Sequence, residues 1–146
     1  MPGIISNRIR YLGGKLSTMQ SDNENKQTKS TLETIQRFND AFNRHNVEEV
    51  MAAMTEDCVF ENTDPPPDGE RFEGHASVRA FWERFFISSP HAVFQVEETF
   101  ACGDRCVVRW RFRWIEADGK DGHVRGVDLF RVRDGKVAEK LSYVKG

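Results

Sequence analysis

Residues 105–116, RCVVRWRFRWIE, alternate between apolar and basic side chains. Successive side chains of a strand face opposite ways, so one face carries only apolar residues: Cys106, Val108, Trp110, Phe112 and Trp114. The other face carries Arg109, Arg111 and Arg113. The alternation predicts a strand whose apolar face lines an interior and whose arginine stripe faces solvent or a second subunit.

Three more segments of strand-like composition lie around this one, at residues 93–101, 123–133 and 136–144. They are separated by Gly103-Asp104, by DGKDG at residues 118–122, and by Asp134-Gly135. Short stretches rich in glycine and aspartate are typical of hairpin turns. The second half of the chain is therefore predicted to fold as an antiparallel meander.

Helical periodicity dominates the first half of the domain, in predicted segments at residues 31–42, 47–54 and 76–87. The third segment carries an apolar stripe at helical spacing: Val78, Phe81, Trp82, Phe85 and Phe86. A strand is predicted at residues 58–62, before the loop TDPPPDG at residues 63–69. Helices followed by a meander predict an α+β domain in which a curved, mostly antiparallel sheet wraps around three N-terminal helices.

Residues 1–30 are predicted to form a disordered N-terminal tail, which leaves residues 31–146 as the globular domain. Residues 20–30, QSDNENKQTKS, contain no apolar side chain and therefore cannot offset the entropy cost of ordering. A short basic amphipathic element at residues 4–16 is the alternative interpretation of the start of this tail.

The composition fits one soluble domain. The chain has 146 residues, of which 38% are hydrophobic and 30% charged, and no run approaches the roughly 20 apolar residues of a membrane span. Residues 1–30 carry a net charge of +3 and residues 31–146 one of −5. An acidic domain is poorly suited to nucleic acid, so neither nucleic acid nor a membrane is expected as a partner.

Three cysteines, Cys58, Cys102 and Cys106, leave one unpaired under any disulfide scheme, which favours a reducing, cytoplasmic location. Cys102 and Cys106 are four residues apart, but no second pair or nearby histidine completes a metal site. The sequence contains no phosphate-binding loop. Neither a metal nor a cofactor is therefore expected.

Five short segments carry a resemblance to a known family: residues 56–62 (EDCVFEN), 72–75 (FEGH), 81–82 (FW), 125–132 (RGVDLFRV) and 134–139 (DGKVAE). Together they resemble the nuclear transport factor 2-like superfamily, and within it the SnoaL-like and ketosteroid-isomerase-like branch. The resemblance spans residues 31–146 and implies a cone-shaped α+β barrel with one internal cavity. It implies no single activity, because the relatives include isomerases, cyclases, hydrolases, dehydratases and proteins without chemistry.

Asp128 is the leading catalytic candidate. It shares a strand face with Phe130 and Val132 and therefore faces the interior if they do. A carboxylate in such a place suits proton transfer near neutral pH. The resemblance implies that this position hydrogen-bonds an enolate oxygen in ketosteroid isomerases and is the acid/base in SnoaL-like cyclases. The alternative is a structural aspartate that a neighbouring cation or hydroxyl holds.

Other positions depart from the catalytic patterns of the family. Asn62 stands where isomerases place their general base, and Asp64 nearby is expected to point to solvent. Phe38 stands where they place an oxyanion tyrosine. Limonene-epoxide hydrolases also carry an asparagine at the Asn62 position, but Trp110, Phe112 and Ser142 replace their Asp-Arg-Asp set. We therefore expect neither steroid isomerisation by the known residues nor epoxide hydrolysis.

Two faces of the last strand compete for the interior. The resemblance turns Lys140, Ser142 and Val144 inward, whereas apolarity alone favours Leu141 and Tyr143. The Lys140 ammonium and the Tyr143 phenol both lie within plausible reach of Asp128. Such a partner of Asp128 is either catalytic or part of a buried ion pair.

The sequence thus predicts a homodimeric domain whose cavity accepts a small, largely apolar ligand. The expected lining residues are Phe38, Phe60, Asn62, Trp82, Trp110, Phe112, Trp114, Asp128, Lys140, Ser142 and Tyr143. The first hypothesis is a cofactor-independent isomerase or cyclase acting on a carbonyl compound, with Asp128 as acid/base and Asn62 as a polar orienting group. The second is a non-catalytic binding or assembly module with the same fold.

Overall fold

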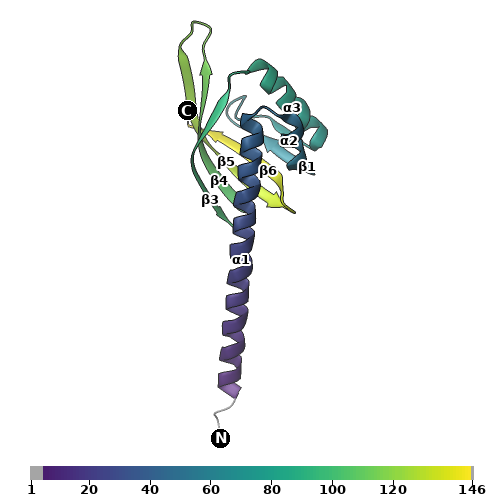
Figure 1. Ribbon diagram of the computed structural model, residues 1–146, viewed down its shortest axis with the longest axis vertical. Coiled ribbons are helices and arrows are strands. Elements are labelled where there is room, and N and C mark those ends of the chain that lie inside the picture. The colour runs from purple at the N-terminus through teal and green to yellow at the C-terminus, as the bar shows by residue number, and fades with distance from the viewer. Residues whose placement is uncertain (1–4, 146) are drawn as a thin grey trace.

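The computed structural model describes residues 5–145, with side chains from residue 18 onward. Its elements are α1 (Ile5–Asn43), α2 (Val47–Ala52), β1 (Met54–Glu61), β2 (Arg71–Glu73), α3 (His75–Ser88), β3 (Val93–Cys102), β4 (Arg105–Ile115), β5 (Asp121–Arg133) and β6 (Lys136–Val144). Figure 1 shows the helices on one side of a twisted sheet, with the N-terminal part of α1 extending away from the body.

The six strands form one sheet in the order β2-β1-β6-β5-β4-β3. Strands β1 and β6 are parallel, and all other neighbouring pairs are antiparallel. The predicted meander is β3 to β6, and its bounds agree with the predicted segments within two residues. The predicted α+β class is confirmed, but the sheet ends at β2 and β3 and is open rather than closed into a barrel.

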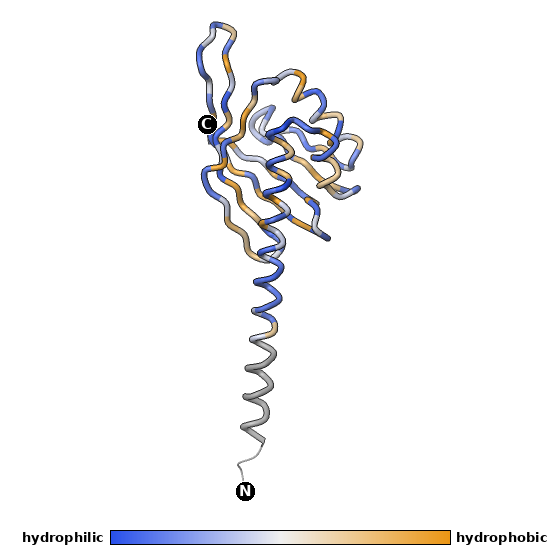
Figure 2. Tube along the Cα trace, in the orientation of Figure 1, coloured by the Kyte–Doolittle hydropathy of each residue, from blue (hydrophilic) through white to orange (hydrophobic). Residues whose placement is uncertain are grey.

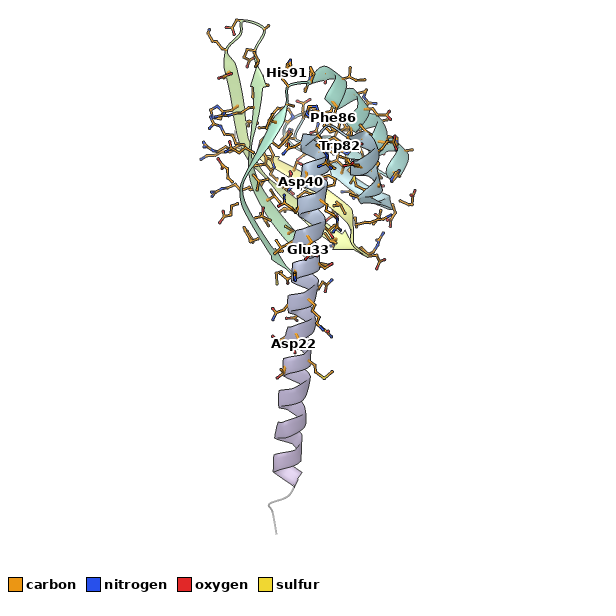
Figure 3. The ribbon with its side chains drawn as sticks, viewed as in Figure 1. Asp22, Glu33, Asp40, Trp82, Phe86 and His91 are labelled. Atoms are coloured by element: carbon orange, nitrogen blue, oxygen red, sulfur yellow. The ribbon has the colours of Figure 1, made fainter. Side chains whose placement is uncertain are left out.

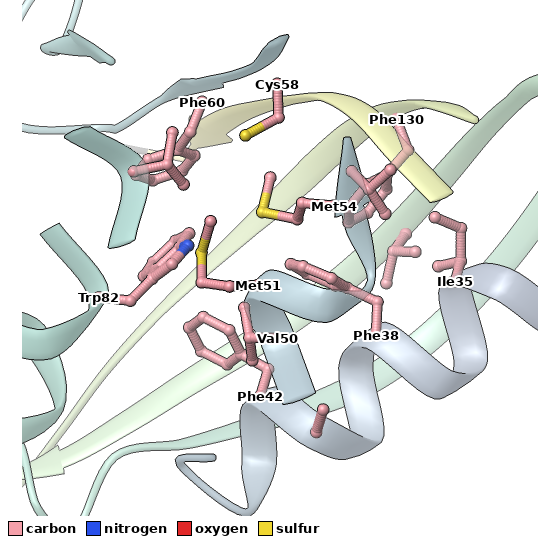
Figure 4. Close-up of a cluster of buried hydrophobic side chains, with 14 of the residues drawn as sticks. Ile35, Phe38, Phe42, Val50, Met51, Met54, Cys58, Phe60, Trp82 and Phe130 are labelled. Carbon is pink, nitrogen blue, oxygen red and sulfur yellow. The ribbon is translucent and has the colours of Figure 1, made fainter. Parts of the chain in front are cut away.

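The hydrophobic core lies between the helices and the inner face of the sheet. Helix α1 contributes Ile35 and Phe38, which are fully buried, and the inner face contributes Phe60 and Phe130. Figure 4 shows these side chains converging with Trp82 of α3. On β4 the predicted alternation holds, because Cys106, Val108 and Trp110 are buried while Arg109 and Arg113 are exposed.

Helix α1 begins far upstream of the predicted start at residue 31. The structure is helical from Ile5 through residue 30, the segment for which the sequence predicts a disordered tail. Residues 1–4 lie outside the described residues. Residues 20–30 contain neither proline nor glycine. A helix whose C-terminal half is packed has already met the cost of nucleation, and each further residue adds a hydrogen bond.

Contact between α1 and the body begins at Thr28. The backbone N–H of Gly103 donates to Thr28 Oγ1 at 2.9 Å, and Thr31 Oγ1 donates to the Gly103 carbonyl at 2.7 Å. Upstream of these contacts the side chains of residues 18–27 are exposed and, except for Met19, hydrophilic (Figure 2), and Figure 3 shows Asp22 well clear of the sheet. The domain boundary at residue 31 stays a prediction.

Two elements between the helices differ from the predicted ones. Helix α2 ends at Ala52 rather than at the predicted Met54. Met54 is instead the first residue of β1 and pairs with Val137 of β6. Strand β2 was not predicted, since it has three residues and only Phe72 among them is buried. None of the described helices has the combination of length and apolar character that crossing a membrane requires.

Candidate functional site

A cavity of about 110 Å³ lies among α1, α3, β1 and the inner face of β3 to β6. Nine aromatic side chains form most of its wall: Phe38, Phe42, Phe60, Phe81, Trp82, Phe85, Phe94, Trp110 and Phe112. Its polar lining consists of a buried set, Asp128, Lys140 and Ser142, and a partly or fully exposed set, Asn39, Asn43, Asn62 and Thr63. The site is therefore an aromatic chamber with a few polar groups at defined positions.

Trp82 contacts aromatic rings on both sides of the cavity wall. Its ring lies 4.3 Å from that of Phe60 on β1 and 4.9 Å from that of Phe42 on α1, measured between centroids. The Phe42 contact is edge-to-face at 89°, an arrangement that the ring quadrupoles favour. Because Trp82 belongs to α3, these contacts join both long helices to the sheet around the cavity.

Gly126 on β5 leaves the space that the Trp110 indole occupies. Trp110 of β4 pairs directly with Gly126, and a Cβ at that glycine would lie 2.5 Å from Cζ2 of the indole. The same Cβ would lie 2.3 Å from the carbonyl oxygen of Tyr143 on β6. The indole of Trp110 therefore packs directly on the backbone of Gly126. A side chain at position 126 would displace the indole.

The buried polar set connects two adjacent strands. Asp128 of β5 pairs in register with Ser142 of β6, and Lys140 precedes Ser142 by two residues on the same face. Ser142 Oγ donates to Asp128 Oδ1 at 2.7 Å. Lys140 Nζ donates to Ser142 Oγ at 2.8 Å and lies 3.1 Å from Asp128 Oδ2. Both carboxylate oxygens of Asp128 therefore have partners.

Aromatic rings surround the ammonium of Lys140. Its Nζ lies 5.0 Å from the ring centroid of Phe60 and 5.8 Å from those of Trp82 and Phe130. Ring faces attract a cation at such distances. The charges of Lys140 and Asp128 compensate each other in a place with little water, which is the condition for burying either one.

Two indole N–H groups of the cavity wall have no hydrogen-bond partner, those of Trp82 and Trp110. Both residues are more than nine-tenths buried. An unpaired buried donor costs about 1–3 kcal/mol. By contrast, Trp114 Nε1 donates to Glu116 Oε1 at 2.8 Å.

The partly exposed asparagines hold the chain near the opening. Asn43 of α1 donates through Nδ2 to the Phe94 carbonyl at 2.9 Å and accepts from the Phe94 N–H at 3.1 Å. Asn62 Nδ2 donates to the Asp64 carbonyl at 3.4 Å. The side chain of Asp64 itself is exposed and does not line the cavity.

The structure brings most of the predicted site residues together. Those that line the cavity are Phe38, Phe60, Asn62, Trp82, Trp110, Phe112, Asp128, Lys140 and Ser142. Two do not. Trp114 lies over Gly122 towards the end of the β4–β5 hairpin, and Tyr143 is 49% exposed on the outer face of the sheet. The inward face of β6 is therefore the one with Lys140 and Ser142.

Several lining residues were not among the lining residues expected from the sequence. Phe81 and Phe85 belong to the predicted helical stripe, and Phe42 lies in the predicted helix at residues 31–42. Phe94 and Val96 of β3 line the cavity as well, which their spacing of two along one strand face could have indicated. Apolar periodicity identifies an inward face but does not separate a filled core from a cavity.

Metal ligation has no candidate among the described residues, where no group of three or more His, Cys, Asp and Glu side chains is placed to hold an ion. Burial raises the pKa of the Cys58 thiol to about 11 and that of Cys106 to about 11. These thiols therefore stay protonated at neutral pH, and the thiolate is the form that binds metals.

Comparison with known families decides the classification, because the model of the SnoaL-like domain matches residues 35–140. The chain belongs to the SnoaL-like domain family. It is 42% identical to a nuclear transport factor 2-like protein of unknown function from Mesorhizobium loti, with a TM-score of 0.70 over 82% of this chain and 94% of that one. No curated protein matches the sequence.

More distant solved structures share the fold of this SnoaL-like chain. One is a candidate polyketide cyclase from Xanthomonas campestris pv. campestris, 21% identical, with a TM-score of 0.68 over 82% of this chain and 93% of that one. Another is TerC co-crystallised with polyporic acid, 19% identical, with a TM-score of 0.69 over 80% of this chain and 92% of that one.

Proposed function

We propose that this SnoaL-like protein binds a small, largely apolar carbonyl compound and catalyses a cofactor-independent acid/base reaction of the isomerase or cyclase type. The observation that carries the proposal is the buried Asp128–Ser142–Lys140 network in the lining of an otherwise aromatic cavity. Two of the structural neighbours support it, one described as a candidate cyclase and one crystallised with a small organic molecule.

The network offers both partners that enolisation needs. The carboxylate of Asp128 is the base for a proton on the carbon next to the carbonyl group, and the ammonium of Lys140 is a donor for the oxygen on which charge develops. Ser142, which bonds both, sets their relative position. Asn62 on the partly exposed part of the lining is a polar group that orients the ligand.

The size of the cavity limits the ligand. About 110 Å³ is well below the roughly 300–1,000 Å³ of sites for drug-sized molecules and close to the ~150 Å³ cavity that admits benzene. The charges of the only lining carboxylate and the only lining ammonium in the described part of the chain cancel. We therefore assign a neutral ligand of about one six-membered ring.

A second function rests on a different reading of the same network. Both oxygens of Asp128 are already bonded, so the ion pair by itself is a sufficient structural reason for the carboxylate. The protein is then a binding or assembly module whose cavity holds a ligand without converting it. The two functions make different predictions for turnover.

A cyclohexenone whose double bond lies β,γ to the carbonyl separates the two. Acid/base catalysis converts it to the conjugated enone, which absorbance follows, and Asp128→Asn lowers the rate by roughly 10²–10⁴-fold. Asp64→Asn, which changes an exposed carboxylate outside the cavity, is the matched control and retains the rate. A rise in melting temperature with the enone and no conversion by the wild type assigns the binding module instead.

We further propose a homodimer formed through the outer face of the sheet. An apolar row crosses four strands there, because Phe100 pairs with Val107, Val107 with Leu129, and Leu129 with Leu141. Phe100 is 57% exposed in the single chain. A second copy covering this row buries about 800 Å² per subunit at the standard interface size.

The cytoplasm remains the proposed location. All three cysteines are free, and two of them are buried in the body. Free buried thiols suit a reducing compartment, where oxidation does not compete with folding.

A further inference from the structure

Lys140 is a primary amine that lines the cavity, with its side chain 8% exposed. We propose that Lys140 is a nucleophile that captures a small neutral aldehyde or ketone as an imine. The proposal rests on the proposed function only in requiring that a carbonyl compound enters the cavity. It adds a covalent intermediate, which enolisation by Asp128 does not need.

The neighbours of Lys140 form the arrangement that an activated nucleophile requires. Such a site has a base within hydrogen-bond reach of the nucleophile and a third group that holds the base. Asp128 Oδ2 lies 3.1 Å from Nζ, and Ser142 Oγ donates to the other oxygen of the same carboxylate at 2.7 Å. Ser142 also accepts from Nζ at 2.8 Å, so it orients both partners.

The choice of lysine over arginine is a second observation. Almost all ion pairs of the described residues use arginine, including Arg79 with Glu48 and Arg105 with Glu139. The buried pair uses Lys140. Arginine is the usual residue of buried ion pairs, whereas the ammonium of lysine becomes a nucleophile once it gives up a proton. The other lysine pair of the described residues, Lys120 with Asp118, is exposed, so Lys140 differs from it in being held inside the fold.

The covalent step balances with the groups present. The Lys140 ammonium passes a proton to the Asp128 carboxylate, and the free amine attacks the carbonyl carbon. One proton of the attacking nitrogen moves to the carbonyl oxygen, which gives a carbinolamine. Asp128 returns the proton to the carbinolamine hydroxyl, the C–O bond breaks, and one water leaves. The products are an iminium ion on Lys140 and the Asp128 carboxylate, so the overall charge of the pair is the same before and after.

Conservation of charge is what allows this step in a buried place. An uncompensated charge would be costly here, but the iminium keeps the positive charge next to Asp128. The rings of Phe60 and Trp82, which lie 5.0 Å and 5.8 Å from Nζ, also face that cation. The ligand class that follows is an uncharged carbonyl compound of about one ring, which the aromatic wall holds near the amine.

Benzaldehyde with sodium cyanoborohydride tests the proposal on the full-length protein. The reductant converts an imine to a stable secondary amine, so captured chains gain one benzyl group, located by peptide mapping. Benzaldehyde has no proton on the carbon next to its carbonyl, so enolisation by Asp128 plays no part. We expect Lys140 to be benzylated about tenfold or more ahead of the exposed Lys136, because the cavity concentrates the aldehyde beside the amine.

Two controls complete the experiment. Toluene, which has the ring without the carbonyl, competes for the cavity and slows labelling of Lys140 but not of Lys136. Lys136→Arg leaves labelling of Lys140 unchanged, and Lys140→Arg removes it. Since the wild-type map identifies the labelled residue, the result stands even if Lys140→Arg does not fold. Labelling of Lys136 and other surface lysines with Lys140 unmodified overturns the imine, and enone isomerisation persisting in that case leaves the proposed acid/base function intact.

Discussion

Lys140 and Asp128 face each other diagonally across β5 and β6, with Nζ and Oδ2 3.1 Å apart and 8% and 7% of their side-chain surfaces exposed. Each charge is tolerated inside the aromatic chamber because the other compensates it. Removing one partner leaves the other as an unpaired buried charge, which costs more than the pair contributes. The two residues must therefore be varied together as well as singly.

Asp128→Asn is expected to lower the free energy of unfolding by about 3–5 kcal/mol, because it leaves the Lys140 ammonium unpaired. Lys140→Met in the same chain removes that charge and restores much of the loss. Urea unfolding of the two single variants and the double variant measures the coupling. An Asp128→Asn variant as stable as the wild type would show that the pair does not support the fold and would leave Asp128 a catalytic role alone.

The close approach of Trp110 to Gly126 predicts that alanine destabilises the fold more at Gly126 than at Gly122. Gly126→Ala forces its Cβ against both the indole of Trp110 and the backbone oxygen of Tyr143, so we expect a loss of about 1–3 kcal/mol. Gly122→Ala is the matched control, because the three atoms nearest to its Cβ all belong to the Trp114 side chain and none to the backbone. Urea unfolding should rank Gly122→Ala as the milder change. Equal losses would mean that the backbone contact is not decisive.

The meander could be predicted from the sequence because its signals are local. Alternation on β4 and the turn at Asp134-Gly135 depend on neighbouring residues only. The parallel pairing of β1 with β6 and the short strand β2 depend on chain segments far apart, and no local pattern contains them. The helical start of α1 was missed for a related reason, since absence of apolar residues indicates absence of packing rather than absence of helix.

The site was predictable in part. The parity of Asp128 with Phe130 and Val132 placed the carboxylate inside correctly. Its partner could not be chosen, because apolarity favoured Tyr143 over Lys140 on the next strand. A lysine ammonium is tolerated in a buried position when a carboxylate lies within ion-pair distance. Whether one does depends on the register between β5 and β6, which no local sequence pattern contains.

The cysteines give a prediction for pH and reactivity. Burial raises the pKa of Cys58 and Cys106 from 9.0 to about 11, so only the exposed Cys102 should react quickly with Ellman's reagent at pH 8. All three react in urea, and Cys102→Ser removes the fast phase. The unfolded chain loses these protons at lower pH than the folded one, so the stability of the fold should fall between pH 9.0 and about 11. A second fast thiol in the native protein contradicts this assignment.

The outer apolar row predicts which substitution separates the proposed dimer. Leu129→Lys places a charge in the middle of the row and should give a monomer mass by light scattering at micromolar concentration. Ile87→Lys is the control, because Ile87 is 81% exposed on α3, away from the sheet face. A monomeric wild type, or a Leu129→Lys variant that remains dimeric, rules out this interface.

We expect the packing of helix α1 against the sheet to depend on Thr28 and Thr31 rather than on the part of the helix that projects from the body. Thr31 is 1% exposed and donates to the Gly103 carbonyl at 2.7 Å, while Thr28 accepts from the Gly103 N–H. Thr31→Val keeps the shape of the side chain and removes the donor, so the half-buried Gly103 carbonyl loses its partner. We expect the free energy of unfolding to fall by about 1 kcal/mol. Deleting residues 1–26 removes neither contact and should leave the urea midpoint and the oligomeric state unchanged. Loss of soluble protein after that deletion would show that the projecting helix packs against a partner, and would move the domain boundary upstream of residue 31.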